Sequence, residues 1–217
     1  MFTGLIQCIG KIRAITPRGT EATLTIESDF HSFQLGESIA INGTCLSVTD
    51  FTDSTFTVFA SVETLQVTGM ARMQTGAPVN LEKALTLSTP LGGHLVTGHV
   101  DTRVRVLERI IQTAASRFRF SLPDSAELQS QIAPKGSVTI DGVSLTVNTV
   151  RDDDFEVMVI PVTLSHTTMG NLQPGMSVNL ETDILAKYIS RKLSGNSGSG
   201  EATGVSMEML IQNGFMR

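Results

Sequence analysis

Short stretches in which apolar and polar residues alternate recur along the chain and predict β-strands. Residues 22–27 (A-T-L-T-I-E) and 117–121 (R-F-R-F-S) alternate with a period of two, which is typical of a strand with one buried face. Residues 36–48 hold two β-branched runs around Asn42-Gly43, a strong signal for a β-hairpin. Further strands are predicted at residues 56–60, 78–83, 155–160 and 177–181.

The predicted elements occur twice along the chain. Residues 38–82 return as residues 137–181 without a gap, and 18 of the 45 aligned positions are identical. The duplication begins near the first residue, because Thr3-Gly4 corresponds to Thr97-Gly98. The offset is 94 at these turns and 99 in the longer block, so the second copy carries about five extra residues. Such insertions fall in surface loops, and we expect this one near residues 124–134.

Each copy is predicted to form a small domain with its own core. A period near 100 residues is too long for a solenoid, whose units span roughly 20–50 residues. Six short strands with one helical turn, ending near Gly69 or Gly170, favour an antiparallel Greek-key barrel. We therefore predict a mainly β protein with two similar six-stranded barrels, over residues 1–93 and 94–183, followed by a C-terminal helix and tail over residues 184–217.

The C-terminal segment has no counterpart in the first copy. Residues 184–193 place apolar side chains on one face of a predicted helix. Residues 194–204 are rich in Ser and Gly and are expected to be flexible, and residues 205–215 predict a last short helix. An amphipathic helix appended to a complete domain packs either on another subunit or on its own barrel, and the sequence leaves both open. Residues 86–94 contain one Pro and two Gly and are expected to link the barrels.

Composition and charge exclude several classes of function. The net charge is −5 and the 16 Lys and Arg residues are scattered, which argues against binding to nucleic acid. The only cysteines, Cys8 and Cys45, have no zinc-site spacing and fit a reducing cytoplasm. The N-terminus lacks the features of a signal peptide, and no run of eighteen apolar residues occurs. We expect a cytoplasmic protein with no membrane partner.

No standard catalytic motif is present, so the candidate chemistry lies where the two copies differ. A thiol, a hydroxyl, an imidazole and a carboxylate occupy corners at which the other copy has a different group, and such groups serve proton transfer and covalent addition. The pairs are Cys45 with Ser144, Leu5 with His99, and Ala84 with Asp183. Drift after duplication would explain these differences equally well. His94 and His99 lack a nearby third ligand, so no metal site is expected.

Five blocks of sequence carry a resemblance to a known family. They are M-F-T-G-L-I, I-N-G-T-C-L-S-V, G-G-H-L-V-T-G-H-V, G-S-V-T-I-D-G-V-S-L-T-V-N and N-L-E-T-D-I-L-A-K-Y. In this order, and with the internal duplication, the chain resembles the riboflavin synthase family of the alpha-subunit type, built from two lumazine-binding repeats, over residues 1–193. The resemblance implies two Greek-key barrels and a C-terminal helix that makes a homotrimer.

The resemblance also implies an activity. The family converts two molecules of 6,7-dimethyl-8-ribityllumazine into riboflavin and 5-amino-6-(D-ribitylamino)uracil by transfer of a four-carbon unit, without a cofactor. Each barrel binds one substrate, and the active site forms where the N-terminal barrel of one subunit meets the C-terminal barrel of its neighbour. Whether the trimer also associates with lumazine synthase stays open.

Two substrate pockets follow from the resemblance, one for each barrel. Backbone groups beside the Thr-Gly turns can pair with the ring, and Thr64 and Thr163 are candidates for holding the ribityl chain. The expected N-terminal pocket comprises Gly4, Leu5, Ile6, Cys45, Leu46, Ser47, Phe59, Ala60, Ser61, Val62, Glu63 and Thr64. The expected C-terminal pocket comprises Gly98, His99, Val100, Lys135, Ser144, Leu145, Thr146, Met158, Val159, Ile160, Pro161, Val162 and Thr163.

Six residues are candidates for catalysis. Ser144 would deliver or polarise a nucleophile, and His99 would shuttle the proton of the substrate's methyl group. Asp183 would orient donors across the subunit boundary, and Cys45 is either a nucleophile or a pocket wall. Phe2 and Thr146 are expected in supporting roles.

Two other functions fit parts of the sequence. One is a non-catalytic carrier of a lumazine or flavin on the same double barrel, for which functional groups would be needed in only one half. The other is an interaction module of paired barrels whose ligand is another protein.

Overall fold

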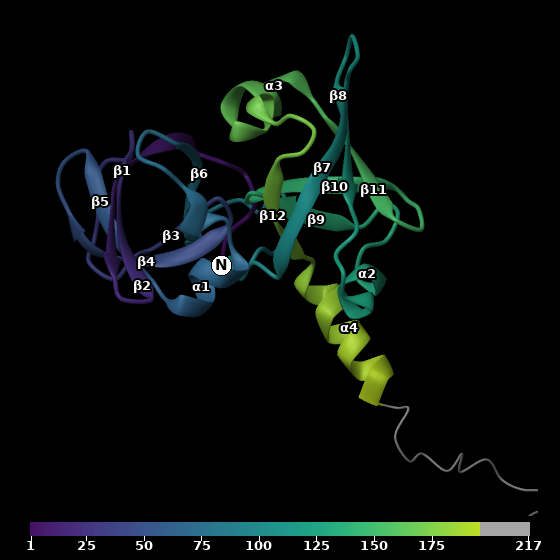
Figure 1. The fold of residues 1–217 in the computed structure, drawn as a ribbon, viewed down its shortest axis with the longest axis horizontal. Helices are drawn as coiled ribbons and strands as arrows, with labels where there is room; N and C mark the ends of the chain where they lie inside the picture. Colours follow the sequence, from purple (N-terminus) through teal and green to yellow (C-terminus); the bar gives the residue numbers. More distant parts are fainter. Residues whose placement is uncertain (196–217) are drawn as a thin grey trace, which may run out of the picture.

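The computed structural model describes residues 1–195 and contains two closed, six-stranded antiparallel barrels, which confirms the predicted fold class (Figure 1). In the first barrel the strand order is β1-β2-β5-β4-β3-β6. Its strands are β1 (Cys8–Arg18), β2 (Glu21–Glu27), β3 (Ser38–Ile41), β4 (Thr44–Phe51), β5 (Thr55–Ala60) and β6 (Pro78–Lys83). Helix α1 (Val62–Val67) and a 3-10 turn, η1 (Met70–Arg72), follow β5.

The second barrel repeats this arrangement in the order β10-β11-β8-β7-β12-β9. Its strands are β7 (Thr102–Ile111), β8 (Ser116–Ser121), β9 (Ser137–Ile140), β10 (Val143–Val150), β11 (Asp154–Val159) and β12 (Ser177–Thr182). Its helical segments are α2 (Ala126–Ser130), α3 (Pro161–His166), η2 (Thr168–Asn171) and α4 (Ile184–Gly195). Helix α2 lies within residues 124–134, the region in which the extra residues of the second copy are predicted. No helix among residues 1–195 is both long and apolar enough to cross a membrane.

The alternating pattern fills each barrel with one face of every strand. On β2 the side chains of Ala22, Leu24 and Ile26 are buried, with more exposed residues between them. In the second barrel Phe120 stacks on Phe155 with ring centroids 5.5 Å apart. Each barrel therefore has its own apolar core, as expected for two domains of this size.

The two predicted hairpin turns meet back to back between the barrels. The φ angles are 45° at Asn42 and at Asp141, and 79° and 80° at the glycines that follow them. Two consecutive positive φ angles define the type I′ turn that suits a hairpin. A Cβ atom on Gly142 would lie 2.7 Å from the backbone nitrogen of Gly43, so only glycine permits this contact.

Asn80 and Asn179 join the barrels by hydrogen bonds to the backbone of these turns, at Asp141 and Asn42. Asn80 Nδ2 donates to the carbonyl of Asp141 over 2.9 Å, and Asn179 Nδ2 donates to the carbonyl of Asn42 over 2.9 Å. All four residues are buried, so their hydrogen bonds offset the cost of removing them from water. The barrels are thus related by an approximate two-fold arrangement, with only Asn42 and Asp141 differing among these four side chains.

The chain leaves the second barrel through α4, which projects away from it beside α2 (Figure 1). An ion pair of 2.7 Å between Lys187 Nζ and Asp101 Oδ1 holds its first turns. Its apolar face remains largely exposed, with Leu185, Tyr188, Ile189 and Leu193 at 59 to 70%. The helix predicted at residues 205–215 lies outside the described residues.

Candidate functional site

Two Thr-Gly turns, one at the start of each sequence repeat, form the centre of the candidate site. Thr3 donates from its backbone nitrogen and its hydroxyl to Glu82 Oε1, both over 2.6 Å, and Gly4 donates to Glu82 Oε2 over 3.0 Å. Thr97 and Gly98 make the same three bonds to Glu181, over 2.7, 2.7 and 3.0 Å. A buried carboxylate of its own barrel therefore holds each turn.

Each turn then reaches across to the other barrel. The backbone nitrogen of Ser144 donates to the carbonyl of Gly4 over 2.8 Å, and that of Cys45 donates to the carbonyl of Gly98 over 2.8 Å. A Cβ atom on Gly4 would lie 2.6 Å from the Ser144 Cβ, so the approach requires glycine. Cys45 and Ser144 thus occupy equivalent places, each beside a turn from the opposite half of the chain.

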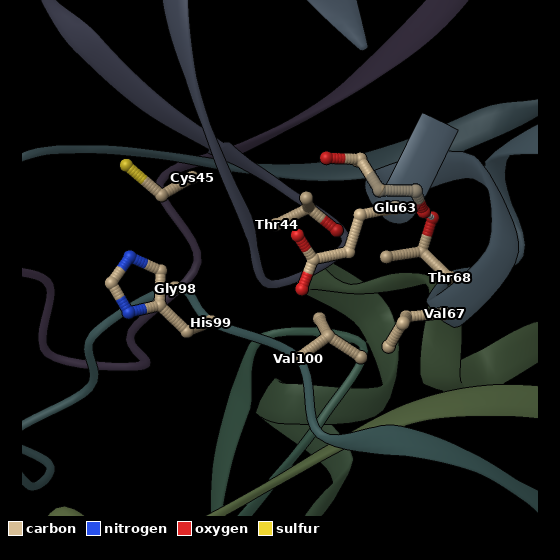
Figure 2. A pocket seen from close by; sticks show the side chains of 9 residues that line it. Thr44, Cys45, Glu63, Val67, Thr68, Gly98, His99 and Val100 are labelled. Carbon is tan, nitrogen blue, oxygen red and sulfur yellow. Dashed lines mark hydrogen bonds between the residues drawn. The ribbon is translucent and has the colours of Figure 1, made fainter. Parts of the chain in front are cut away.

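Two cavities of similar size lie beside these contacts between a Thr-Gly turn and the other barrel. The Cys45 pocket has a volume of about 220 Å³ and is lined by Thr44, Cys45, Glu63, Thr64, Val67, Thr68, Gly98, His99 and Val100 (Figure 2). The Ser144 pocket has a volume of about 270 Å³ and is lined by Gly4, Leu5, Ile6, Val143, Ser144, Val162, Thr163, His166 and Thr167. Every residue of one pocket thus has an equivalent in the other.

The structure corrects the predicted membership of the two pockets. The family resemblance implies that residues 4–6 lie beside Cys45 and residues 98–100 beside Ser144. The turns are exchanged instead, since each one is anchored in its own barrel but extends over the hairpin of the other. Each pocket is therefore made from both halves of the chain.

In the Cys45 pocket, thiol and imidazole share one side. Figure 2 shows the Cys45 sulfur and the His99 ring on one side, with Val67 and Thr68 on the other. Thr44 lines this pocket, and its hydroxyl is buried and has no hydrogen-bond partner among the described residues. A buried hydroxyl without a partner requires an explanation, and a polar group of a bound ligand would provide one.

Next to the Ser144 pocket, the side chain of His94 lies close to the Ser144 hydroxyl. His94 Nδ1 lies 2.7 Å from Ser144 Oγ, within hydrogen-bond distance. Burial lowers the pKa of His94 below its ordinary value, and the negative charge of Asp183 partly opposes this shift. A neutral imidazole at this distance can accept a proton from the serine hydroxyl. Sequence reasoning gave His94 no role, and at an offset of 94 it has no counterpart in the first copy.

The structure places the three other candidate catalytic residues, and the predicted binding residue Lys135, outside both cavities. Phe2 is fully buried beneath the Gly98 turn, and its backbone pairs with Val96. Thr146 is exposed on β10, and Asp183 Oδ1 accepts the backbone nitrogen of Leu185 over 2.9 Å at the start of α4. The Lys135 side chain is exposed, and its φ of 68° is unusual for a residue with a side chain. Catalytic or ligand contacts for them stay predictions.

Other predicted binding residues surround the cavities without lining them. The side chains of Leu46 and Leu145 belong to the two barrel cores. The remaining members of this group are Ser47, Phe59, Ala60, Ser61, Val62, Met158, Val159, Ile160 and Pro161. Sequence reasoning missed six lining residues: Thr44, Val67, Thr68, Val143, His166 and Thr167. Helical spacing from Thr64 and Thr163 would have found four of them.

Comparison with known proteins agrees with this architecture. A family model described as a lumazine binding domain matches residues 3–84 and 97–183. The chain is 37% identical to a riboflavin synthase of Photobacterium phosphoreum over 219 residues, which covers 100% of both chains. It is 39% identical to that of Actinobacillus pleuropneumoniae, over 99% of this chain and 100% of the relative.

Solved structures show the same fold at lower identity. The crystal structure of LumP complexed with 6,7-dimethyl-8-(1'-D-ribityl) lumazine matches with a TM-score of 0.76 at 22% identity, over 84% of this chain and 99% of LumP. The riboflavin complex of LumP matches with a TM-score of 0.77 at 24% identity, over the same shares. Two lumazine-binding domains that span most of the sequence, together with full-length relatives at more than one-third identity, show that this chain belongs to the riboflavin synthase family.

Proposed function

We propose that the protein is a transferase that converts two molecules of 6,7-dimethyl-8-ribityllumazine into riboflavin and 5-amino-6-(D-ribitylamino)uracil. The observation that carries this proposal is the presence of two equivalent cavities with unlike reactive groups. Cys45 and His99 line one cavity, and Ser144, within hydrogen-bond distance of His94, lines the other. One substrate must give up a four-carbon unit and the other must receive it. Like cavities with unlike groups meet that need.

The Ser144 pocket is equipped to activate a nucleophile. The Ser144 hydroxyl can pass its proton to the neutral His94 ring, which would allow the oxygen, or a water that it holds, to add to C7 of one lumazine. The backbone nitrogen of His94 donates to the Thr3 carbonyl over 3.2 Å, so the N-terminal turn fixes the position of the histidine.

The Cys45 pocket would hold the second substrate. Deprotonation of its C7 methyl group gives a delocalised carbanion that donors near the ring can stabilise. His99 lines this cavity and is the candidate proton acceptor there, while Cys45 is either a nucleophile or a wall. The two products together contain all the atoms of the two substrates, so the reaction needs no redox cofactor.

The active enzyme is proposed to be a homotrimer in which neighbouring subunits complete the site. The exposed apolar face of α4 supports association, and both cavities are smaller than the 300–1,000 Å³ that is usual for small-molecule sites. Both cysteines of the chain are free thiols, which supports a reducing compartment such as the cytoplasm. Association with lumazine synthase is not part of this proposal.

A turnover assay tests the proposal and separates it from the alternative of a carrier. Purified protein is incubated with 6,7-dimethyl-8-ribityllumazine, and riboflavin is followed by its fluorescence. We expect one riboflavin for every two lumazine molecules consumed. Binding of lumazine without product at any protein concentration would instead indicate a non-catalytic carrier.

A further inference from the structure

The carboxylates of Glu82 and Glu181 have no role in the proposed chemistry, although they are among the most buried charged groups of the protein. Their exposed fractions are 3% and 2%, and burial raises the pKa of both above its ordinary value. A buried carboxylate is costly unless hydrogen bonds compensate for its lost hydration. In both cases the compensating donors are the three groups of one Thr-Gly turn.

The threonine of each turn passes this constraint on to the pocket. Thr3 Oγ1 donates to Glu82 and accepts the backbone nitrogen of Leu5 over 3.1 Å. In the second copy, Thr97 Oγ1 donates to Glu181 and accepts the backbone nitrogen of His99 over 3.2 Å. The carboxylate thus fixes the backbone of the residue that lines a cavity.

The cavity served by each carboxylate belongs mainly to the other barrel. Glu82 lies on β6 of the first barrel, whereas Leu5 lines the Ser144 pocket beside β10 and α3 of the second. Glu181 lies on β12 of the second barrel, whereas His99 lines the Cys45 pocket beside β4 and α1 of the first. Neither carboxylate lines a cavity itself, so any effect on a ligand must pass through the turn.

We propose that Glu82 and Glu181 are positioning residues that act crosswise, Glu82 on the Ser144 pocket and Glu181 on the Cys45 pocket. This inference rests on the proposed function for the identity of the ligand. It differs from an ordinary structural role in a specific way, because each residue affects the pocket of the barrel to which it does not belong.

Replacing each glutamate by glutamine tests the inference with little change in volume. In Glu82→Gln the side-chain oxygen can still accept from Thr3, but the new NH2 group faces the N–H of Gly4, which places two donors against each other. The same conflict arises at Gly98 in Glu181→Gln. Loss of a hydrogen bond to a charged group should weaken ligand binding in the affected pocket about ten- to a hundredfold.

The experiment needs a readout that tells the two pockets apart. Calorimetric titration with riboflavin counts the occupied sites in each variant. In a Cys8→Ala background Cys45 is the only thiol, and the rate of its modification by iodoacetamide, with and without riboflavin, reports occupancy of the Cys45 pocket. Thr3→Val and Thr97→Val, which remove the hydroxyl of the same turns, provide a second pair in case a glutamine variant does not fold.

The expected results are opposite for the two variants. Glu181→Gln should lose riboflavin protection of Cys45 and retain one tight site, whereas Glu82→Gln should retain the protection and lose the other site. Thr97→Val and Thr3→Val should follow the same division. Loss of protection in Glu82→Gln with retention in Glu181→Gln would overturn the inference, as would equal effects, or none, on both sites in folded variants.

Failure of the proposed function would look different. A wild-type protein that neither binds riboflavin nor consumes 6,7-dimethyl-8-ribityllumazine would contradict the function itself. The wild-type protein could instead turn over the substrate while riboflavin never protects its Cys45 from modification. That result would leave the function standing and contradict the crosswise assignment.

Discussion

The two barrels share a backbone plan but differ in the side chains placed on it. Both have the same strand order, a type I′ turn at the interface and a Thr-Gly turn held by a buried glutamate. At matching corners, however, Cys45 stands opposite Ser144 and Thr44 opposite Val143. The duplication thus preserved the geometry of the cavity, while the side chains that line it diverged.

The outer faces of the barrels differ as well. On the first barrel, Thr25 and Thr57 pair across β2 and β5 with their hydroxyls 3.2 Å apart. The second barrel instead carries a network of arginines and carboxylates on β7, β8 and β11 and in the turn before β11, in which Arg117 contacts both Glu108 and Glu156. Such partly exposed ion pairs stabilise a fold only modestly. The surface difference is therefore less informative about function than the difference between the pockets.

Removing the serine hydroxyl should have the largest effect, because Ser144 lies within hydrogen-bond distance of His94, whereas no such bond joins Cys45 to a histidine among residues 1–195. Ser144→Ala should lower the turnover number about 10²- to 10⁴-fold while riboflavin affinity changes much less. His94→Gln should lower turnover to a similar degree. Steady-state kinetics and a riboflavin titration measure both quantities, with Ser54→Ala, an exposed loop serine, as the control. An unchanged turnover number in Ser144→Ala would remove this residue from the mechanism.

Disrupting α4 tests whether the second barrel's extra helix matters for activity. Ile189→Glu places a charge on the exposed apolar face and leaves Asp183 and the barrel intact, so we expect a monomer with at least tenfold lower activity. Truncation after Thr182 should give the same result, whereas Arg191→Glu, on an exposed basic residue, should remain associated. Light scattering and the turnover assay measure these outcomes. A fully active monomer would show that one chain completes the site.

The single difference in the inter-barrel polar cluster predicts a difference in pH dependence. Burial raises the pKa of Asp141 from 3.8 to about 7, and the hydrogen bond from the Asn179 backbone nitrogen and the attraction of Arg103 oppose this shift only partly. Between about pH 4 and pH 7 the unfolded state loses a proton that the folded state retains. The stabilising contribution of the protonated Asp141 is therefore complete below about pH 4 and disappears as the pH rises to about 7. Asn does not titrate, so Asp141→Asn should not lose stability in this way.

We therefore expect Asp141→Asn to gain stability relative to wild type as the pH rises. The difference between their free energies of unfolding should shift in favour of the variant by about 2–3 kcal/mol from pH 5 to pH 8. Asn is the residue that the first barrel has at this position, and Asn42 Oδ1 accepts the Asn80 nitrogen over 2.7 Å. Urea unfolding at both pH values measures the difference, and Asn42→Asp should show the opposite trend. Parallel pH profiles for wild type and Asp141→Asn would refute the assignment.

The smallest effect is expected from exchanging Thr44 and Val143, which have nearly the same shape. Thr44→Val removes a buried hydroxyl that has no hydrogen-bond partner among residues 1–195, and it should weaken the binding of riboflavin in the Cys45 pocket about two- to tenfold. Val143→Thr adds a hydroxyl to the Ser144 pocket and serves as the matched exchange. Site-resolved riboflavin titration compares them. An affinity at the Cys45 pocket that Thr44→Val leaves unchanged would show that the hydroxyl does not contact the ligand.

Local patterns in the sequence were sufficient to predict the barrels but not the assembly of the pockets. Alternation and the turns at residues 42–43 and 141–142 act within a few residues, so the strands and hairpins could be foreseen. The exchange of the Thr-Gly turns depends on how two complete barrels dock, and the pairing of His94 with Ser144 joins residues that are distant in sequence. Comparing the copies could not reveal His94, which lies before the region they share.

The central claim is that both barrels bind the same ring in chemically unlike pockets. A crystal structure of the protein soaked with 6,7-dimethyl-8-ribityllumazine or riboflavin tests it most directly. The account predicts one ring beside Cys45 and His99 and a second beside Ser144, each in contact with the turn that belongs to the opposite barrel. A ring in only one of these pockets, at saturating ligand, would contradict it.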